Sequence, residues 1–199
     1  LFFDNTPPEV SGLYPKTGSF INVAELSYSL NEDLIEGFVV WSPIDGTQPV
    51  KIDLLSNELL AGTFGIGTLN GQIGLADGVV YNIKISIKDK ALNETNITLA
   101  ENITFDVTKP EFTQVSPVAS SRVNTQTVSW NVNENLQSGK YTWIHMGGEP
   151  DLAAPHEFNL SDNLLKPGFG DNSKLPSLNL VVNAMYRITL EGTDLAGNT

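Results

Sequence analysis

Apolar and polar residues alternate along several short segments of the chain, and this alternation predicts β-strands. "ELSYSLNE" (25–32) and "QTVSWNVNE" (126–134) place every second side chain on one face, with Tyr28 or Trp130 on the apolar side. "YNIKISIKD" (81–89) and "YRITLEGTD" (186–194) alternate in the same way. Because side chains on one face of a strand recur every two residues, these segments are expected to be half-buried strands.

Further strands are expected at "GFVVW" (37–41) and "KYTWI" (140–144), which carry Trp41 and Trp143. No segment of comparable length has helical periodicity with capping residues, although "PDLAAPHEF" (150–158) is compatible with a short turn. Short strands that recur about every 8–12 residues with turn signals between them are typical of β-sandwiches. The fold class is therefore predicted to be all-β.

The same pattern occurs twice in the chain. Early matches lie 102 positions apart: Pro8 and Pro110, Leu30 and Val132, Gly37 and Gly139, and Trp41 and Trp143. Later matches lie 105 positions apart: Tyr81 and Tyr186, Asp89 and Asp194, and Asn93 and Asn198. Internal repetition of this density indicates two copies of one domain, with a three-residue insertion expected between Trp143 and about Leu180.

Two aromatic positions indicate the type of sandwich. Tyr81 and Tyr186 each open a strand after a turn, which resembles the tyrosine corner of immunoglobulin-like domains. Trp41 and Trp143 stand where such domains bury a tryptophan between the sheets. We therefore expect both corner hydroxyls to bond to backbone nearby, and we expect the tryptophans to belong to the core.

The linkers "DNTPP" (4–8) and "DVTKP" (106–110), with the closing segments "DKALN" (89–93) and "DLAGN" (194–198), resemble a known family. They are similar to the tandem immunoglobulin-like, cadherin-like repeats of large bacterial surface and adhesin proteins. The resemblance implies two immunoglobulin-like β-sandwiches in an extended arrangement. The expected divisions are a tail of a preceding repeat at 1–4, a first domain at 5–106, and a second domain at 107–199 whose last strand is missing.

The composition narrows the classes of partner. A net charge of −12 argues against nucleic acids and anionic membrane surfaces, and the chain has no cysteine for disulfides or thiolate sites. No apolar run approaches the roughly 18 residues that cross a bilayer, so no membrane insertion is expected in this segment. The resemblance implies an extracellular or cell-surface location, with neighbouring repeats and a surface protein or glycan ligand as partners.

Acidic and amide residues recur at matched positions and form the candidate metal sites. The strand order of a sandwich brings the linker, the turn after the second strand and the closing turn to one pole. The expected calcium ligands are Asp106, Glu134, Asp194 and Asn198, with a second, weaker set at Asp4, Glu32, Asp89 and Asn93. The alternative is that the aspartates only cap tight turns.

Two functions remain open at this stage. The first is a non-enzymatic structural or adhesive stalk module, made rigid by calcium at the domain junction. The second is an accessory, carbohydrate-binding module of a secreted hydrolase, which would need an exposed aromatic strip. No enzyme is expected, because His145 and His156 are isolated, no nucleophile motif occurs, and "GTFGIGTLNG" (62–71) precedes no helix.

Overall fold

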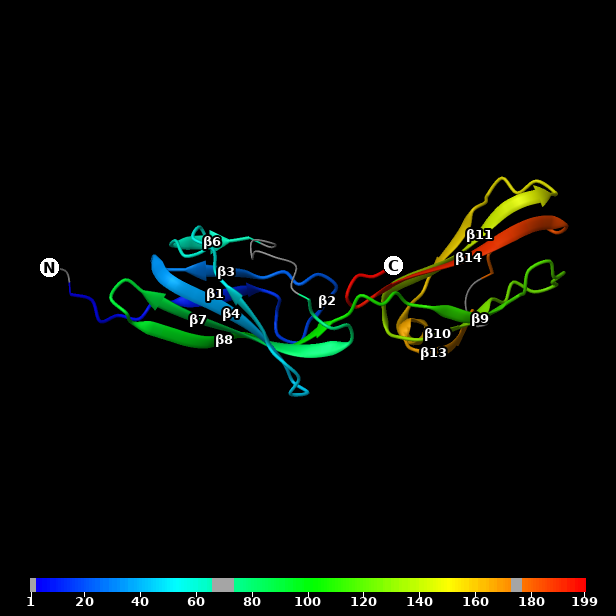
Figure 1. Cartoon of the computed structure of the whole chain (residues 1–199). Helices are drawn as coiled ribbons and strands as arrows, with labels where there is room; N and C mark the ends of the chain where they lie inside the picture. Colours follow the sequence, from blue (N-terminus) through cyan, green and yellow to red (C-terminus); the bar gives the residue numbers. More distant parts are fainter. Residues whose placement is uncertain (1–2, 66–73, 173–176) are drawn as a thin grey trace. The chain divides into compact units, whose positions relative to one another are not determined.

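The computed structural model describes residues 3–65, 74–172 and 177–199. The chain divides into two compact units, Leu1–Val107 and Thr108–Thr199, so the border lies one residue from the expected one. Each unit consists of β-strands arranged in two sheets (Figure 1). In the described ranges, no helix has the length and apolar character needed to span a bilayer.

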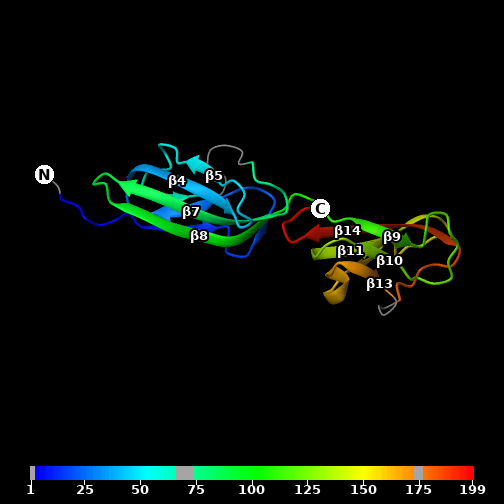
Figure 2. The same ribbon diagram turned by 60° about the horizontal axis from the view of Figure 1, so that its bottom comes forward.

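Eight strands lie in the described residues of the first unit. They are β1 (Val10–Tyr14), β2 (Phe20–Ile21), β3 (Ser27–Leu30), β4 (Leu34–Pro43), β5 (Val50–Asp53), β6 (Gly62–Phe64), β7 (Val79–Asp89) and β8 (Glu94–Phe105). One sheet has the order β1-β3-β6 and the other the order β2-β8-β7-β4-β5. Figure 2 shows β5, β4, β7 and β8 side by side. All these neighbours are antiparallel except β2 and β8.

The second unit repeats this arrangement with six strands in the residues that the structure describes. They are β9 (Phe112–Ser116), β10 (Ser129–Val132), β11 (Leu136–Gly148), β12 (His156–Asn159), β13 (Gly168–Asp171) and β14 (Ala184–Asp194), with a short 3₁₀ helix η1 (Asp162–Leu165). The sheets have the orders β13-β10-β9 and β12-β11-β14, and all their neighbouring strands are antiparallel.

The alternating positions form the core between the two sheets of each unit. Trp41 and Trp130 are fully buried and Trp143 is 3% exposed, which confirms that the three tryptophans are core residues. Tyr28 and Trp130, which were expected to face inward, are also fully buried. The apolar phase of each strand therefore decides which face packs, because burial of apolar surface is the main favourable contribution to folding.

The register of the strands locates the insertion in the second repeat. Val50 lies opposite Trp41, whereas His156 lies opposite Trp143, so the offset between the repeats has risen from 102 to 106 at this point. The additional residues therefore lie in the connection between β11 and β12, within the range expected. The segment 150–158 contains a turn followed by β12, and in "GTFGIGTLNG" the first three residues form β6 while 66–71 lie outside the described residues.

A matched glycine in each unit makes room for a matched leucine. A Cβ atom on Gly37 would lie 2.8 Å from Cδ1 of Leu54, and a Cβ on Gly139 would lie 2.8 Å from Cδ1 of Leu160. Both leucines are buried, and each donates its backbone N–H to the carbonyl of the glycine. Gly37 and Gly139 recur because any larger residue would collide with the core.

The closing turns of the two units share one geometry. Asp89 donates its backbone N–H to the carbonyl of Asn93 at 3.1 Å, and Asp194 donates to Asn198 at 3.0 Å. The residue before each asparagine has positive φ, 72° at Leu92 and 94° at Gly197. Glycine adopts this left-handed conformation without steric cost, whereas leucine does not.

Replacing Leu92 by glycine is therefore expected to stabilise the first unit. The leucine side chain is 67% exposed, so little packing is lost, and removing its Cβ relieves the left-handed strain. We expect the free energy of unfolding to rise by about 1 kcal/mol, measured by urea denaturation. Ala91→Gly, in the same turn but without a positive φ, is the control and should not stabilise. A loss of stability in Leu92→Gly would contradict this account.

Candidate cation site

Three carboxylates from distant parts of the sequence meet at one pole of the first unit. Asp4 precedes β1, Glu32 lies in the turn between β3 and β4, and Asp89 ends β7. Each offers one carboxylate oxygen, and these oxygens lie within 4.8 Å of one another. Their role as metal ligands stays a prediction.

Strand pairing explains why these residues meet. β1 pairs with β3 so that Val10 lies opposite Leu30, and β4 pairs with β7 so that Leu34 lies opposite Asp89. The start of β1, the β3–β4 turn and the end of β7 must therefore lie at the same end of the sandwich. Asn31 joins the β3–β4 turn to the segment before β1, since its Oδ1 accepts the backbone N–H of Glu9 at 2.7 Å.

Asp89 has a structural role in its turn. Its Oδ1 accepts the backbone N–H groups of Ala91 at 2.7 Å and Asn93 at 2.9 Å, and its Oδ2 accepts the side-chain amide of Asn93 at 2.8 Å. Burial by itself raises the pKa of Asp89, but the hydrogen bonds from Asn93 and Ala91 outweigh it and hold that pKa below the ordinary value. The expected turn cap is therefore present.

Glu32 faces an excess of negative charge. Its pKa is raised above the ordinary value, first by burial and then by the charges of Asp89, Asp4 and Asp33. Asp33 itself is engaged elsewhere, because its Oδ2 forms an ion pair with Nζ of Lys90 at 3.0 Å. Glu32, Asp4 and Asp89 thus form a group of mutually repelling carboxylates, which a cation would stabilise.

The asparagines of both closing turns donate side-chain hydrogen bonds to the aspartates, and their expected role as metal ligands stays a prediction. Nδ2 of Asn93 donates to Oδ2 of Asp89 and also lies 3.2 Å from the backbone oxygen of Thr6. Three acceptors around one end of the amide require that end to be the nitrogen. Asn198 likewise donates Nδ2 to Oδ2 of Asp194 at 2.7 Å. Both asparagines therefore orient the aspartate.

The second set has the same composition. Asp106, Glu134 and Asp194 match Asp4, Glu32 and Asp89 in residue type and in their places along the sequence, and their role as metal ligands stays a prediction. Asp194 repeats the turn cap in detail, because its Oδ1 accepts the N–H groups of Ala196 at 2.8 Å and Asn198 at 2.9 Å. The residues of the first set all belong to one unit.

A different polar cluster, which the sequence did not reveal, lies in the second unit. Nε2 of His156 is 2.7 Å from Oδ2 of Asp151, and the hydroxyl of Tyr186 donates to the same oxygen at 2.5 Å. The Asp151 side chain is only 3% exposed. These hydrogen bonds, first that of Tyr186 and then that of His156, lower the pKa of Asp151 to about 2. Asp151 belongs to the longer β11–β12 connection, so no matching residue in the first repeat pointed to it.

The tyrosine corners have the expected hydrogen bonds. The hydroxyl of Tyr81 accepts the backbone N–H of Ala76 at 2.8 Å, and that of Tyr186 accepts the backbone N–H of Val181 at 2.9 Å. Tyr81 is 3% exposed, whereas Tyr186 is only half-buried. Both corners therefore tie the start of a long strand to the loop that precedes it.

Comparisons with known proteins were made for the whole chain. No protein-family model matches it, and no curated protein matches its sequence. Among solved structures, the crystal structure of chicken CNTN1 FN1-FN3 domains is similar, with 14% identity and a TM-score of 0.47. The match covers 98% of this chain and 62% of that chain. The narrower resemblance to bacterial surface repeats has no support in these comparisons, and the fold is established here by strand pairing.

Removing one hydroxyl from each corner is expected to have unequal effects. Tyr81→Phe leaves the N–H of Ala76 without its acceptor, at a cost of about 1–3 kcal/mol in the free energy of unfolding. Tyr186→Phe should cost more, because it also removes a donor from the buried Asp151 carboxylate. Urea denaturation of both variants checks this order, and an equal or smaller loss in Tyr186→Phe would contradict it.

Acid should weaken the second unit through Asp151. The pKa of this group in the folded protein is about 2, below its ordinary value of 3.8, so its stabilising contribution is present above about pH 4. That contribution is lost as the pH falls from about 4 to 2. Unfolding midpoints measured between pH 7 and pH 2 should show a smaller decline over this interval in Asp151→Asn than in the wild type. Equal declines of the unfolding midpoint in both proteins would show that protonation of Asp151 does not weaken the second unit.

Proposed function

We propose that this chain is a non-enzymatic structural or adhesive module of a larger extracellular or cell-surface protein, in which it lengthens a stalk. We propose further that the carboxylate groups at the closing turns bind calcium. The observation that carries the second part is the group of Asp4, Glu32 and Asp89 in the first unit, whose residue types recur at 106, 134 and 194 of the sequence. The tandem repetition of one sandwich supports the first part.

The chemistry of the donor set favours a hard cation. The groups consist of carboxylate oxygens, with no histidine or cysteine among their members. Calcium takes six to eight oxygen ligands, whereas zinc prefers sulfur and nitrogen. Asp4, Glu32 and Asp89 would supply three oxygens, and backbone carbonyls and water would complete the shell. The hydrogen bonds to Asp89 do not exhaust its lone pairs, so it is able to cap the turn and bind an ion together.

Glu32 is the residue that separates a cation site from a turn cap. The hydrogen bonds that form the turn come from Asp89 and Asn93, and Glu32 has no part in them. A cap alone would favour an uncharged residue at position 32, because its carboxylate is disfavoured by the neighbouring charges. An acidic residue recurs at this position, as Glu32 and Glu134, and a cation beside Glu32 would offset the repulsion among the carboxylates there.

The carbohydrate-binding alternative loses its main support. Sugar stacking would need exposed aromatic faces, and Trp41, Trp130 and Trp143 are all buried in the cores. The tryptophans therefore contribute to packing, and the stalk module is the function that we retain.

Calcium should raise the melting temperature of the wild-type protein relative to protein in chelator. Binding to the native state alone adds about 2.7 kcal/mol to the free energy of unfolding at a hundredfold excess over the dissociation constant. Differential scanning calorimetry in calcium and in EGTA measures this difference. Equal melting temperatures for the wild type in both buffers would show that the carboxylates serve only as turn caps and surface charges.

Glu32→Gln should change the stability of the first unit differently in the two buffers. In chelator the first unit should be as stable as the wild type or more stable, because one repelling charge is gone. In calcium it should be less stable, because a ligand is gone. Glu101→Gln removes the same charge from an exposed position of β8. It should leave the stability equal to that of the wild type in chelator and in calcium.

A further inference from the structure

Asn-X-Ser/Thr triplets occur at four places in the sequence, and the structure gives them different surroundings. The triplets begin at Asn93, Asn96, Asn102 and Asn159. Such a triplet is the acceptor motif for N-linked glycans in exported proteins, where the modified asparagine lies at the surface. The surroundings of each asparagine therefore decide whether the folded protein accommodates a glycan there.

The side chain of Asn93 is already committed to the closing turn. Its Nδ2 donates to Oδ2 of Asp89 at 2.8 Å and lies 3.2 Å from the backbone oxygen of Thr6. The hydroxyl of Thr95, the third residue of the triplet, donates to the backbone oxygen of Pro8. A sugar on Nδ2 of Asn93 would displace these hydrogen bonds, so Asn93 is a poor acceptor.

Asn96 has the opposite character. Asn96 and Thr98, the first and third residues of its triplet, lie in β8 and are both exposed. Within the described part of the chain, neither side chain forms a hydrogen bond. The amide of Asn96 is therefore available for modification without any loss of structure.

The register of the strands shows what lies beside Asn96. Asn96 is opposite Ser86 of β7, and Ser86 is opposite Phe38 of β4. Ser86 and Phe38 alternate with the buried Ile85 and Val39, so this row of side chains lies on the face of the sheet that points away from the core. Figure 2 shows β4, β7 and β8, which carry the row, side by side. The row extends roughly 10 Å from Asn96 to Phe38, because neighbouring strands lie about 4.8 Å apart.

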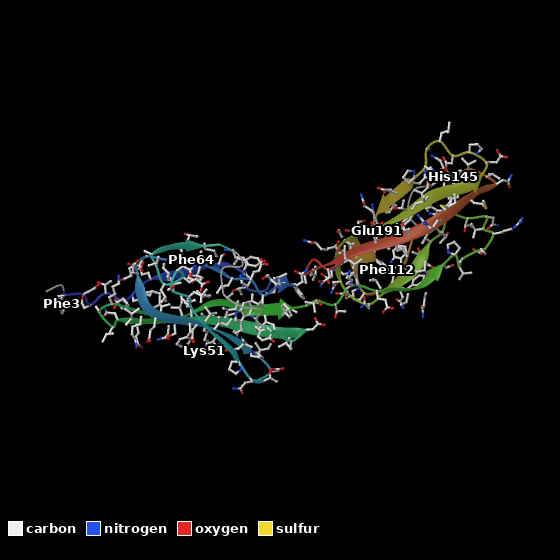
Figure 3. All side chains as sticks on the ribbon, turned by 45° about the horizontal axis from the view of Figure 1, so that its top comes forward. Phe3, Lys51, Phe64, Phe112, His145 and Glu191 are labelled. Atoms are coloured by element: carbon white, nitrogen blue, oxygen red, sulfur yellow. The ribbon has the colours of Figure 1, made fainter. Side chains whose placement is uncertain are left out.

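A shallow groove follows this row. Its volume is about 310 Å³, and its lining on the outer face consists of Phe38, Val40, Lys84, Ser86, Asn96 and Thr98. Phe38 and Val40 are half-buried and form the apolar side of the groove. Figure 3 labels Lys51 on the same sheet, and its Nζ lies 4.0 Å from the centre of the Phe38 ring. The groove thus offers an apolar wall on one side and polar groups on the other, which suits a saccharide ring.

The corresponding position of the second unit is charged. Lys140 takes the place of Phe38, and it lies opposite Asn159. The Nζ atom of Lys140 forms ion pairs at 3.3 and 3.6 Å with two glutamates of the neighbouring strands, Glu157 and Glu191. A sugar on Asn159 would therefore meet an ion-paired lysine, whereas a sugar on Asn96 meets an apolar wall.

We propose that Asn96 is an acceptor for an N-linked oligosaccharide and that the first sugar of this glycan packs into the groove between Asn96 and Phe38. The C–H face of the sugar ring covers Phe38 and Val40, and its polar groups bond to Ser86 and Lys84. The inference rests on the proposed extracellular location, because only an exported chain meets the glycan donor.

The transfer is a substitution at the anomeric carbon of the first sugar. The donor is an oligosaccharide that is linked to a lipid through pyrophosphate. A bond forms between the anomeric carbon and Nδ2 of Asn96, and the bond between that carbon and the pyrophosphate oxygen breaks. The amide loses one proton and the lipid pyrophosphate leaves, so no oxidant or reductant takes part.

The first test exports the chain from a mammalian cell line behind a secretion signal. Modified asparagines are mapped by mass spectrometry after enzymatic release of the glycans in heavy-oxygen water. Asn96 should carry a glycan in most secreted molecules, Asn93 should be unmodified, and Thr98→Ala should abolish the modification of Asn96. An unmodified Asn96 in the secreted wild-type protein would overturn the proposal.

The second test measures the packing of the sugar. Trimming with an endoglycosidase leaves one N-acetylglucosamine on Asn96, and Asn96→Gln provides the same chain without it. The single sugar should raise the melting temperature of the first unit, and Phe38→Thr should remove at least half of this rise. Ile35→Thr changes an exposed apolar residue of the same strand outside the groove and should leave the rise unchanged. An equal rise in Phe38→Thr and in the wild type would overturn the packing of the sugar on Phe38.

All these melting curves are recorded in EGTA, so they do not depend on calcium. The calcium effect is measured separately, on protein produced in bacteria without a glycan. Failure of the glycan tests is therefore distinguishable from failure of the proposed calcium-binding module.

Discussion

A buried aspartate at the end of one long strand organises the same pole of each repeat. Asp89 and Asp194 are each 1% exposed and accept two backbone N–H groups and one side-chain amide from the turn that follows. A buried carboxylate is stable only when its oxygens have such donors. In the first unit, the side chain of Asp89 forms the turn that leads into β8 and also supplies one of the three carboxylates of the candidate cation site.

The cores of the two repeats place their large side chains at different positions. In the first unit Tyr28 lies opposite Phe64 and their rings stack at 5.0 Å, whereas in the second Trp130 lies opposite Gly170. A Cβ on Gly170 would be 2.9 Å from the Trp130 ring, so the larger indole requires the glycine.

The same exchange occurs near the closing turn. Ile87 of the first unit corresponds to Gly192, and Val10 corresponds to Phe112, whose ring lies 3.0 Å from the position of a Cβ on Gly192. Interiors are packed at nearly constant density, so a gain in volume at one position is matched by a loss at its neighbour. Either difference, Ile87 to Gly192 or Val10 to Phe112, would be unfavourable alone, whereas the two together keep the space filled.

Much of this protein follows from the sequence by itself. Alternation at period two determined the strands, their inward faces and the buried tryptophans, because a one-residue slip would turn the whole apolar set toward water. Repetition at offsets of 102 and 105 determined that there are two related units, and it brought Asp4, Glu32 and Asp89 to one pole by strand order alone. These are local or periodic properties, so a single sequence contains them.

Tertiary structure decided the remainder. The orientation of the Asn93 amide depends on the backbone oxygens of Asp4 and Thr6, more than eighty positions away, and the sequence did not indicate these hydrogen bonds. The cluster of Asp151, His156 and Tyr186 depends on how the longer β11–β12 connection folds back, and no repeated pattern marked it. Each of these features depends on which distant groups meet in space, and residue types and their spacing along the chain do not encode that directly.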